Sequence, residues 1–238
     1  MRPIGIVAAL LLSLSLAACS DDDPAVQPPS TSSTTAAPST TATTAATTSS
    51  SVVPVPADQA IWPVPGTAAR FADPVAAVRS FAKDYLGMTA PVVGAYRAGE
   101  PRAGEVEVRR KAGPGPVTVV SVRELKPGAW SVVAAASDNL RLESPDALQT
   151  VSSPLRISGR STAFEAEIGV GIRADGQRAG QFLAETHTMG GANGEMGPFA
   201  TTLEYGTPRR EAGAVLLFVM SAEDGSLQEA TVVRVRFG

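Results

Sequence analysis

The chain has 238 residues, a formal net charge of −3 and a sequence pI of about 5.3, so no basic surface argues for nucleic acid as a partner. Its one cysteine and one histidine exclude an intramolecular disulfide and the usual sets of zinc ligands. Regular apolar patterns begin only after the first 57 residues, and the remainder is long enough for one or two small domains with their own cores.

Residues 1–18 have the three parts of an export signal. A charged start, Met1 and Arg2, precedes an apolar run that ends in small residues, and this run is shorter than the roughly 20 residues that a membrane-spanning helix needs. We therefore expect a signal peptide. Residues 16–19, LAAC, resemble the lipobox of bacterial lipoproteins, which implies that Cys19 receives a thioether-linked diacylglycerol. The alternative is an ordinary secretory signal that ends near a free thiol.

Residues 19–57 have the composition of a disordered linker. Residues 30–51 include 16 serines and threonines among 22 positions, with no apolar periodicity that could form a core. Such a tract can carry O-linked glycans or remain unmodified. With palmitate or other acyl chains on Cys19, each buried methylene contributing about 0.8 kcal/mol, we expect a lipid anchor on the outer face of the cytoplasmic membrane.

Residues 58–138 predict an α+β unit with one helix on an antiparallel meander. Asp73 before a proline is typical of a helix start, apolar residues recur at helical spacing up to Tyr85, and Gly87 can end the helix. Four segments that alternate with period two follow, separated by glycine-containing and proline-containing turns: residues 91–97, 105–110, 116–125 and 129–136.

This order of elements is similar to cystatin-like and nuclear-transport-factor-like rolls, some of which enclose a pocket. Tyr96 and Trp130 could line such a pocket, or they could be ordinary core residues. The pocket would make residues 58–138 a small-molecule-binding or enzymatic roll, and this is the alternative function.

Residues 139–238 predict an all-β immunoglobulin-like sandwich of about seven strands. Apolar residues in 166–173 alternate with Glu167, two glycines and Arg173, which predicts a half-buried strand that ends in a turn at Asp175 and Gly176. Residues 233–237 alternate valine and phenylalanine with Arg234 and Arg236 in the same way. The remaining strand segments are 140–144, 155–161, 180–188, 198–205 and the apolar run 214–220, which precedes a hairpin turn at Asp224 and Gly225.

Several short motifs of this second unit lie in the order of a known family. They are SPL at 153–155, SG at 158–159, AFE at 163–165, GPF at 197–199, SAEDG at 221–225 and the terminal VVRVRF. Residues 150–237 thereby resemble the immunoglobulin-like domain of spore-germination proteins, the Gmad-type domain of bacterial envelope lipoproteins. The resemblance implies an envelope location and a role in sporulation or germination, and it carries no catalytic residue. Residues 58–138 resemble the partner domain of actinobacterial lipoproteins of this type.

The candidates for catalysis are few. An enzyme needs a nucleophile with a base, a metal set or a carboxylate pair. His187, with Glu185 two residues earlier on the same strand face, is the candidate general base or ligand, and a solvent-facing strand position is the alternative. Glu165 and Glu167 form one carboxylate cluster, expected on one strand.

Two further groups are interpreted as structural. Glu223 and Asp224 predict a hairpin turn rather than a calcium site, because no stretch has the spacing of an EF-hand loop. The glycine-rich residues 190–197 lack the lysine and following helix of a phosphate loop, so we expect a mobile loop between strands.

The sequence therefore predicts a non-catalytic envelope lipoprotein with no metal and no cofactor, and it assigns no ligand-binding residue. The expected partners are the membrane, through lipidated Cys19, and an envelope protein or a cell-wall polymer. Loops or an edge strand such as residues 181–188 would supply the binding surface.

Overall fold

The computed structural model describes residues 59–238, which belong to one compact unit. The expected signal peptide, the lipidation of Cys19 and the linker of residues 19–57 lie outside the described residues. Within residues 59–238, no helix has both the length and the apolar character that crossing a membrane requires.

The helix of the first layer is α1, Pro74–Ser80, which continues as a π-helical turn, η2, Phe81–Tyr85. The Asp73 side chain accepts a hydrogen bond from the Ala76 amide at 2.7 Å, and proline occupies the first helical position. Gly87 follows with a φ of +86°, the left-handed conformation that favours glycine after a helix. The helix predicted between Asp73 and Gly87 is confirmed.

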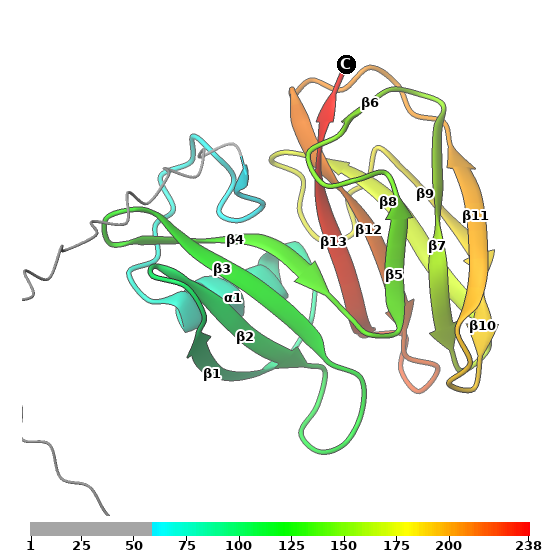
Figure 1. Cartoon of the computed structure of the whole chain (residues 1–238), viewed down its shortest axis with the longest axis horizontal. Helices are drawn as coiled ribbons and strands as arrows, with labels where there is room; N and C mark the ends of the chain where they lie inside the picture. Colours follow the sequence, from blue (N-terminus) through cyan, green and yellow to red (C-terminus); the bar gives the residue numbers. More distant parts are fainter. Residues whose placement is uncertain (1–58) are drawn as a thin grey trace, which may run out of the picture. The chain divides into compact units, whose positions relative to one another are not determined.

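Four antiparallel strands follow in order, each paired with the next. They are β1, Val92–Ala98, β2, Ala103–Arg109, β3, Thr118–Lys126, and β4, Ala129–Ala136. The helix lies against one face of this sheet (Figure 1), and Val78, Phe81 and Tyr85 are buried there. The predicted fold class of this unit, one helix on a meander, is confirmed.

Residues 139–238 form two β-layers around a second core. Their strands are β5, Leu140–Ser144, β6, Thr150–Val151, β7, Leu155–Ala163, β8, Glu167–Ala174, β9, Ala184–Met189, β10, Gly191–Ala192, β11, Gly197–Leu203, β12, Ala212–Met220, and β13, Leu227–Phe237. One layer contains β13, β12, β8 and β9, and the other contains β5, β7 and β11 (Figure 1).

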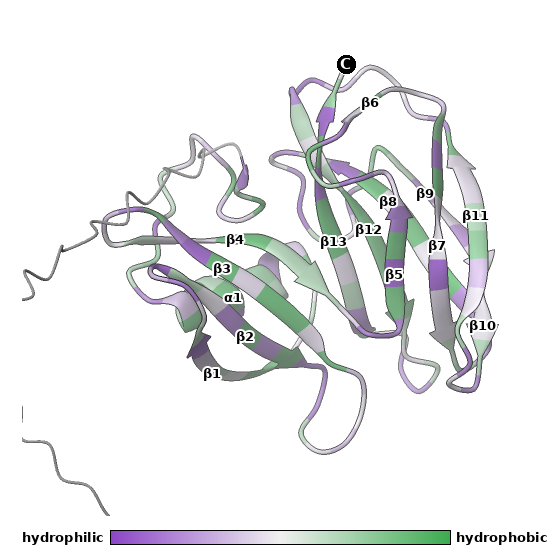
Figure 2. Cartoon of the chain, viewed as in Figure 1, coloured by the Kyte–Doolittle hydropathy of each residue, from purple (hydrophilic) through white to green (hydrophobic). Residues whose placement is uncertain are grey.

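The immunoglobulin-like sandwich is thus confirmed, and its seven longer strands are the seven predicted segments. Figure 2 shows apolar residues along the strands of both layers. Ile157 from one layer and Val170, Leu217 and Val235 from the other belong to one buried cluster. Because these 100 residues contain no cysteine, packing holds the two layers together without a disulfide.

The meander of β1 to β4 and the sandwich layer of β13, β12, β8 and β9 are parts of one continuous sheet. β4 pairs with β13 through Ala135 and Val232, so the strand order is β1-β2-β3-β4-β13-β12-β8-β9. Along β12, Leu216 and Phe218 belong to the core beneath the helix, whereas Val215 and Leu217 belong to the core of the sandwich. Successive side chains of a strand point to opposite faces, so β12 is covered on both, which explains its unbroken apolar run.

The prediction that β8 is half-buried is wrong, because its second face is also covered. A Cβ atom on Gly169 would lie 2.2 Å from the ring of Phe218, and one on Gly171 would lie 2.5 Å from the ring of Phe182. The two glycines therefore leave space for aromatic rings to lie directly on the strand. The alternation of apolar and small residues marks two different interior surfaces rather than an interior and an exterior one.

Arg173, which follows Gly171 on the same face of β8, is 2% exposed and connects β8 to the end of the helix. Its guanidinium carbon lies 4.6 Å from the ring centroid of Tyr85 and 4.5 Å from that of Phe182. The guanidinium donates hydrogen bonds to the backbone carbonyls of Tyr85, at 2.5 Å, and Gln181, at 2.9 Å. Burial lowers the pKa of Arg173 and raises the pKa of Tyr85 to about 12.

The predicted alternation of residues 233–237 needs a second correction. Arg236 is exposed, but Arg234 is only 4% exposed and forms an ion pair with Asp175, whose Oδ2 lies 2.7 Å from Nη2 of the arginine. Gly176 has a φ of +91°, which confirms the predicted turn at Asp175 and Gly176. The turn thus holds the carboxylate that neutralises Arg234.

We expect Arg173→Ala to lower the free energy of unfolding by about 3 kcal/mol, because it leaves the Tyr85 carbonyl without its donor and removes two cation–π contacts. Urea unfolding of the full-length chain measures this change. Arg156→Ala, at an exposed position of β7, is the control and should change stability by about 0.5 kcal/mol or less. Equal stability of the two variants would contradict a role of Arg173 in connecting the layers.

Candidate functional site

A cleft of about 730 Å³ lies between the β2–β3 loop on one side and the β7–β8 turn on the other. The sheet face that carries Arg173, Gly171 and Gly169 continues to Glu167, since these are alternate residues of one strand. The layer with the helix covers the first part of this face, and Glu167 is exposed at the uncovered end. The cleft therefore includes the uncovered end of this sheet face, and residues of β7 and of the surrounding loops also line it.

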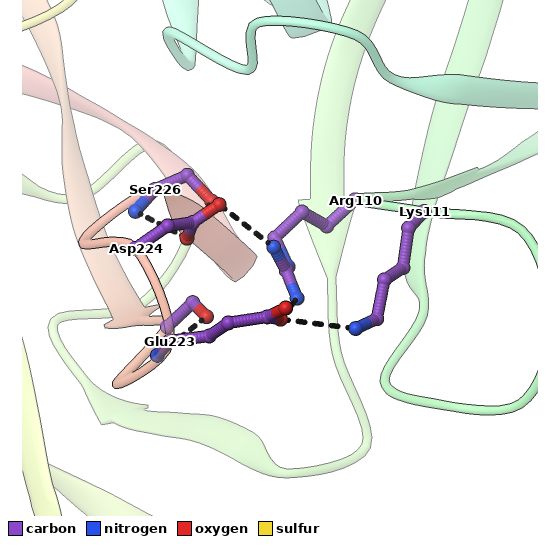
Figure 3. A network of polar contacts seen from close by, with 6 residues as sticks. Arg110, Lys111, Glu223, Asp224 and Ser226 are labelled. Carbon is purple, nitrogen blue, oxygen red and sulfur yellow. Dashed lines mark hydrogen bonds and ion pairs between the residues drawn. The ribbon is translucent and has the colours of Figure 1, made fainter.

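Basic and acidic side chains meet at one side of the cleft. Arg110 Nη2 lies 2.7 Å from Glu223 Oε2, and Arg110 Nη1 lies 3.0 Å from Asp224 Oδ2. Lys111 Nζ lies 3.0 Å from the same Glu223 oxygen. Figure 3 shows this network, with the two cations reaching from the loop after β2 to the turn between β12 and β13. Both cations of this loop are neutralised by carboxylates of the turn.

The predicted hairpin at Glu223 and Asp224 is confirmed. Ser221 N donates to the Ser226 carbonyl at 2.8 Å and closes the turn, and both the amide and the hydroxyl of Ser226 donate to Asp224. Hydrogen bonds from Arg110 lower the pKa of Glu223, and those from Ser226 lower the pKa of Asp224. Within residues 59–238, no group of three or more histidine, cysteine, aspartate or glutamate side chains could hold a metal ion.

Glu229 also lines the cleft and is 2% exposed. The Ser137 hydroxyl donates a hydrogen bond to its carboxylate, and Asn139 Nδ2 donates to both oxygens at 3.1 and 3.2 Å. The Ser137 amide donates to Thr231 Oγ1 at 3.0 Å. Burial raises the pKa of Glu229, and the two hydrogen bonds partly oppose this shift. The network fixes residues 137–139, which connect β4 to β5.

His187 lies on β9 at the opposite side of the cleft. Its Nδ1 lies 3.4 Å from Glu167 Oε1, and its ring meets the edge of Phe218 with centroids 6.4 Å apart. The partner is thus Glu167 of the neighbouring strand rather than the expected Glu185. In residues 59–238, no hydroxyl or thiol donates a hydrogen bond to His187, and its side chain is 50% exposed.

Glu165 does not lie on a strand with Glu167, and that prediction is wrong. β8 begins at Glu167, and Ala166 has a φ of +61°, so residues 164–166 form the turn after β7. The turn places Phe164 at the cleft with 78% of its surface exposed. The sequence marks Phe164 only as part of the AFE motif, in a segment with strand-like alternation, so this exposed aromatic was missed.

Two other large apolar residues, Met189 and Met220, are also exposed. Met220, at the end of β12, is 46% exposed and lines the cleft. Met189 is 60% exposed, pairs with Glu167 across the β8–β9 ladder and lies on the same face of β9 as His187. Exposed apolar side chains mark an interaction site where they form a contiguous patch.

Trp130 lines a small hollow of about 100 Å³ with residues of the segment before the helix, and Tyr96 does not line it. Their rings meet edge to face with centroids 5.3 Å apart, and both pack against the core beneath the helix. The Tyr96 hydroxyl donates to the Ala103 carbonyl at 2.9 Å. The two rings are therefore partly buried and pack at the edge of the core, which is closer to the core interpretation of the sequence than to a shared pocket.

The glycine-rich segment of residues 190–197 is only partly a loop. Gly191 and Ala192 form β10, which pairs in parallel with the end of β7. The Gly194 amide donates to Thr162 Oγ1 at 3.0 Å. The segment thus continues the sheet beside the turn that carries Phe164, and Asn193 and Gly194 line the cleft.

The fold and the site define an immunoglobulin-like domain that shares a sheet with a helix-covered α+β layer. Residues 139–226 match a family described as the immunoglobulin-like domain of bacterial spore germination. The match runs from β5 to the turn before β13 and confirms the resemblance expected for this part of the chain. The chain matches no curated protein and no solved structure.

We expect Glu229→Gln to gain stability relative to the wild type as the pH rises above 4.5, the usual pKa of a glutamate. A carboxyl whose pKa is raised on folding binds more protons in the folded state, so the wild type loses stability between 4.5 and the raised pKa. Urea unfolding of both proteins from pH 4 to pH 8 measures the difference. Glu204→Gln, at an exposed position, should show no such trend, and parallel curves for Glu229→Gln and wild type would contradict the shift.

Proposed function

We propose that this chain is a lipid-anchored envelope protein that acts as a non-catalytic interaction module and holds its partner in the cleft. The observation that carries this proposal is the cleft of about 730 Å³ with Phe164 and Met220 exposed along it and Met189 exposed nearby. A concave surface with exposed aromatic and methionine side chains is typical of sites that bind another protein.

The polar groups of the cleft favour binding over catalysis. Glu229, the buried carboxyl, is held by Ser137 and Asn139, which connect two strands. His187 and Glu167 are 50% and 60% exposed, so solvent screens the pair, and an efficient general base is usually held in a drier site. The family match to an immunoglobulin-like domain supports the same conclusion.

The location at the membrane rests on the sequence. The lipobox-like residues 16–19 would supply the anchor, and the serine- and threonine-rich residues 19–57 would tether the rest of the chain to it. A partner in the envelope, close to the membrane, is within reach of such a tether. The family match supports a process related to spore germination, and an envelope protein fits the apolar rim better than a wall polymer does.

We expect Cys19→Ala to move the protein from the membrane fraction to the soluble fraction of the envelope and to abolish labelling by an alkyne analogue of palmitate. Cell fractionation with detergent partitioning, together with the label, measures both effects. A variant that stays in the membrane fraction would show that Cys19 is not the anchor.

We expect a photo-reactive amino acid at Met220 to form one dominant adduct in living cells, because this position lies on the rim of the cleft. The same amino acid at Val92 is the matched control, since Val92 is 41% exposed, close to the 46% of Met220, and does not line the cleft. Mass spectrometry of the adducts identifies what was captured. Equal capture at the two positions, or none at Met220, would contradict binding in the cleft.

A further inference from the structure

Within the described part of the chain, charged side chains on one side of the cleft form ion pairs with lysine or arginine, and those on the other side do not. Arg110 and Lys111 form ion pairs with Glu223 and Asp224, and Arg109 Nη2 lies 3.3 Å from a Glu107 oxygen. On the opposite side, no lysine or arginine of residues 59–238 forms an ion pair with Glu165 or Glu167. The carboxylates that remain available to a partner therefore belong to the side formed by the β7–β8 turn.

These carboxylates are interleaved with exposed apolar side chains. Phe164 precedes Glu165 in the turn, and Met189 is the cross-strand partner of Glu167. We call Phe164, Glu165, Glu167 and Met189 the acidic apolar patch. Phe164 and Met189 are 78% and 60% exposed, so the patch offers large contact surfaces next to negative charge.

The backbone beneath the patch is fixed. The Gly190 amide donates to the Ala166 carbonyl at 2.9 Å, and the Asn193 amide donates to the Ala163 carbonyl at 3.3 Å. These bonds join the β7–β8 turn to the glycine-rich segment that follows β9. A surface that is already ordered loses little conformational entropy on binding, which favours recognition of a specific shape.

We propose that the acidic apolar patch binds a protein segment that presents an apolar side chain flanked by lysine or arginine. This inference rests on the proposed function and names the chemistry of the partner. The apolar side chain packs against Phe164 and Met189, and the flanking cations pair with Glu165 and Glu167. Complementary charge selects a cationic protein segment, because a neutral or anionic wall polymer would form no ion pair with Glu165 and would leave Glu167 with His187 alone.

The test uses the full-length chain in cells, with the photo-reactive amino acid at Met220 and further substitutions in the patch. We expect Glu165→Gln with Glu167→Gln to reduce adduct yield at least roughly fivefold, as the loss of two rim ion pairs implies. Phe164→Ser should reduce it by a similar factor. Matched controls are Glu204→Gln with Glu211→Gln, which remove the same charge at exposed positions away from the cleft, and Val92→Ser; these should leave the yield unchanged.

Sequencing the adduct gives an independent readout, and the cross-linked partner residue should lie next to lysine or arginine. An adduct whose yield is insensitive to the patch variants, or that maps to an acidic segment, overturns the inference while leaving the interaction module intact. An adduct released by muramidase and resistant to protease identifies a wall polymer and also overturns it. Absence of any Met220 adduct overturns the proposed function together with the inference. Circular dichroism of each purified variant verifies that it is folded.

Discussion

The architecture depends on two strands that are buried on both faces. β12 and β13 pair along nearly their whole length, and their two faces contribute to different cores. Leu216 lies beneath the helix and Leu217 lies inside the sandwich, although they are neighbours in sequence. The core beneath the helix and the core of the sandwich both require side chains of these strands. The α+β layer and the immunoglobulin-like layers are therefore parts of one compact unit rather than independent domains joined by a linker.

The cleft follows from this shared sheet. A short helix can cover only part of a sheet face, and the aromatic rings of Phe182 and Phe218 extend the cover over Gly171 and Gly169. Beyond these glycines the same face is exposed, and it carries larger side chains, Glu167 on β8 and Met189 on β9. The position of the cleft is therefore set by where the cover ends. Ion pairs between Arg110 and the β12–β13 turn and the hydrogen bonds of Glu229 then hold the surrounding loops in place.

The local elements could be predicted because their signals are local. The cap at Asp73, the turn at Asp224 and the period-two strands each depend on residues a few positions apart. The corrections concern contacts between distant residues. Arg173 is buried against Tyr85, 88 positions earlier in the chain, and Ser137 meets Glu229 across 92 positions. A pattern of alternating residues shows that a strand has two different faces, but not that a second layer covers the face with glycine and arginine.

The candidate site shows the same limit. His187 stands out in the sequence because it is the one histidine, and the structure does place it at the cleft. Its carboxylate neighbour comes from β8 and not from its own strand, since cross-strand neighbours are as close as alternate residues of one strand. The exposure of Phe164 could not be predicted because the turn that contains it has no sequence signal. Ala166 adopts a positive φ, so β8 begins only at Glu167, but alanine does not indicate this conformation as glycine or asparagine would.

The balance between exposed and buried groups decides what the cleft is suited to do. The buried carboxyl group of Glu229 accepts hydrogen bonds from Ser137 and Asn139. Its pKa is raised because burial removes the charged form from water. The exposed groups Phe164 and Glu165 of the cleft, and Met189 nearby, are the ones whose surroundings would change most when another molecule covers them. Covering the two apolar side chains removes their surface from water, a gain of about 25 cal/mol per Å² that would stabilise a complex. These properties of the cleft are the basis for the proposal that it binds another molecule.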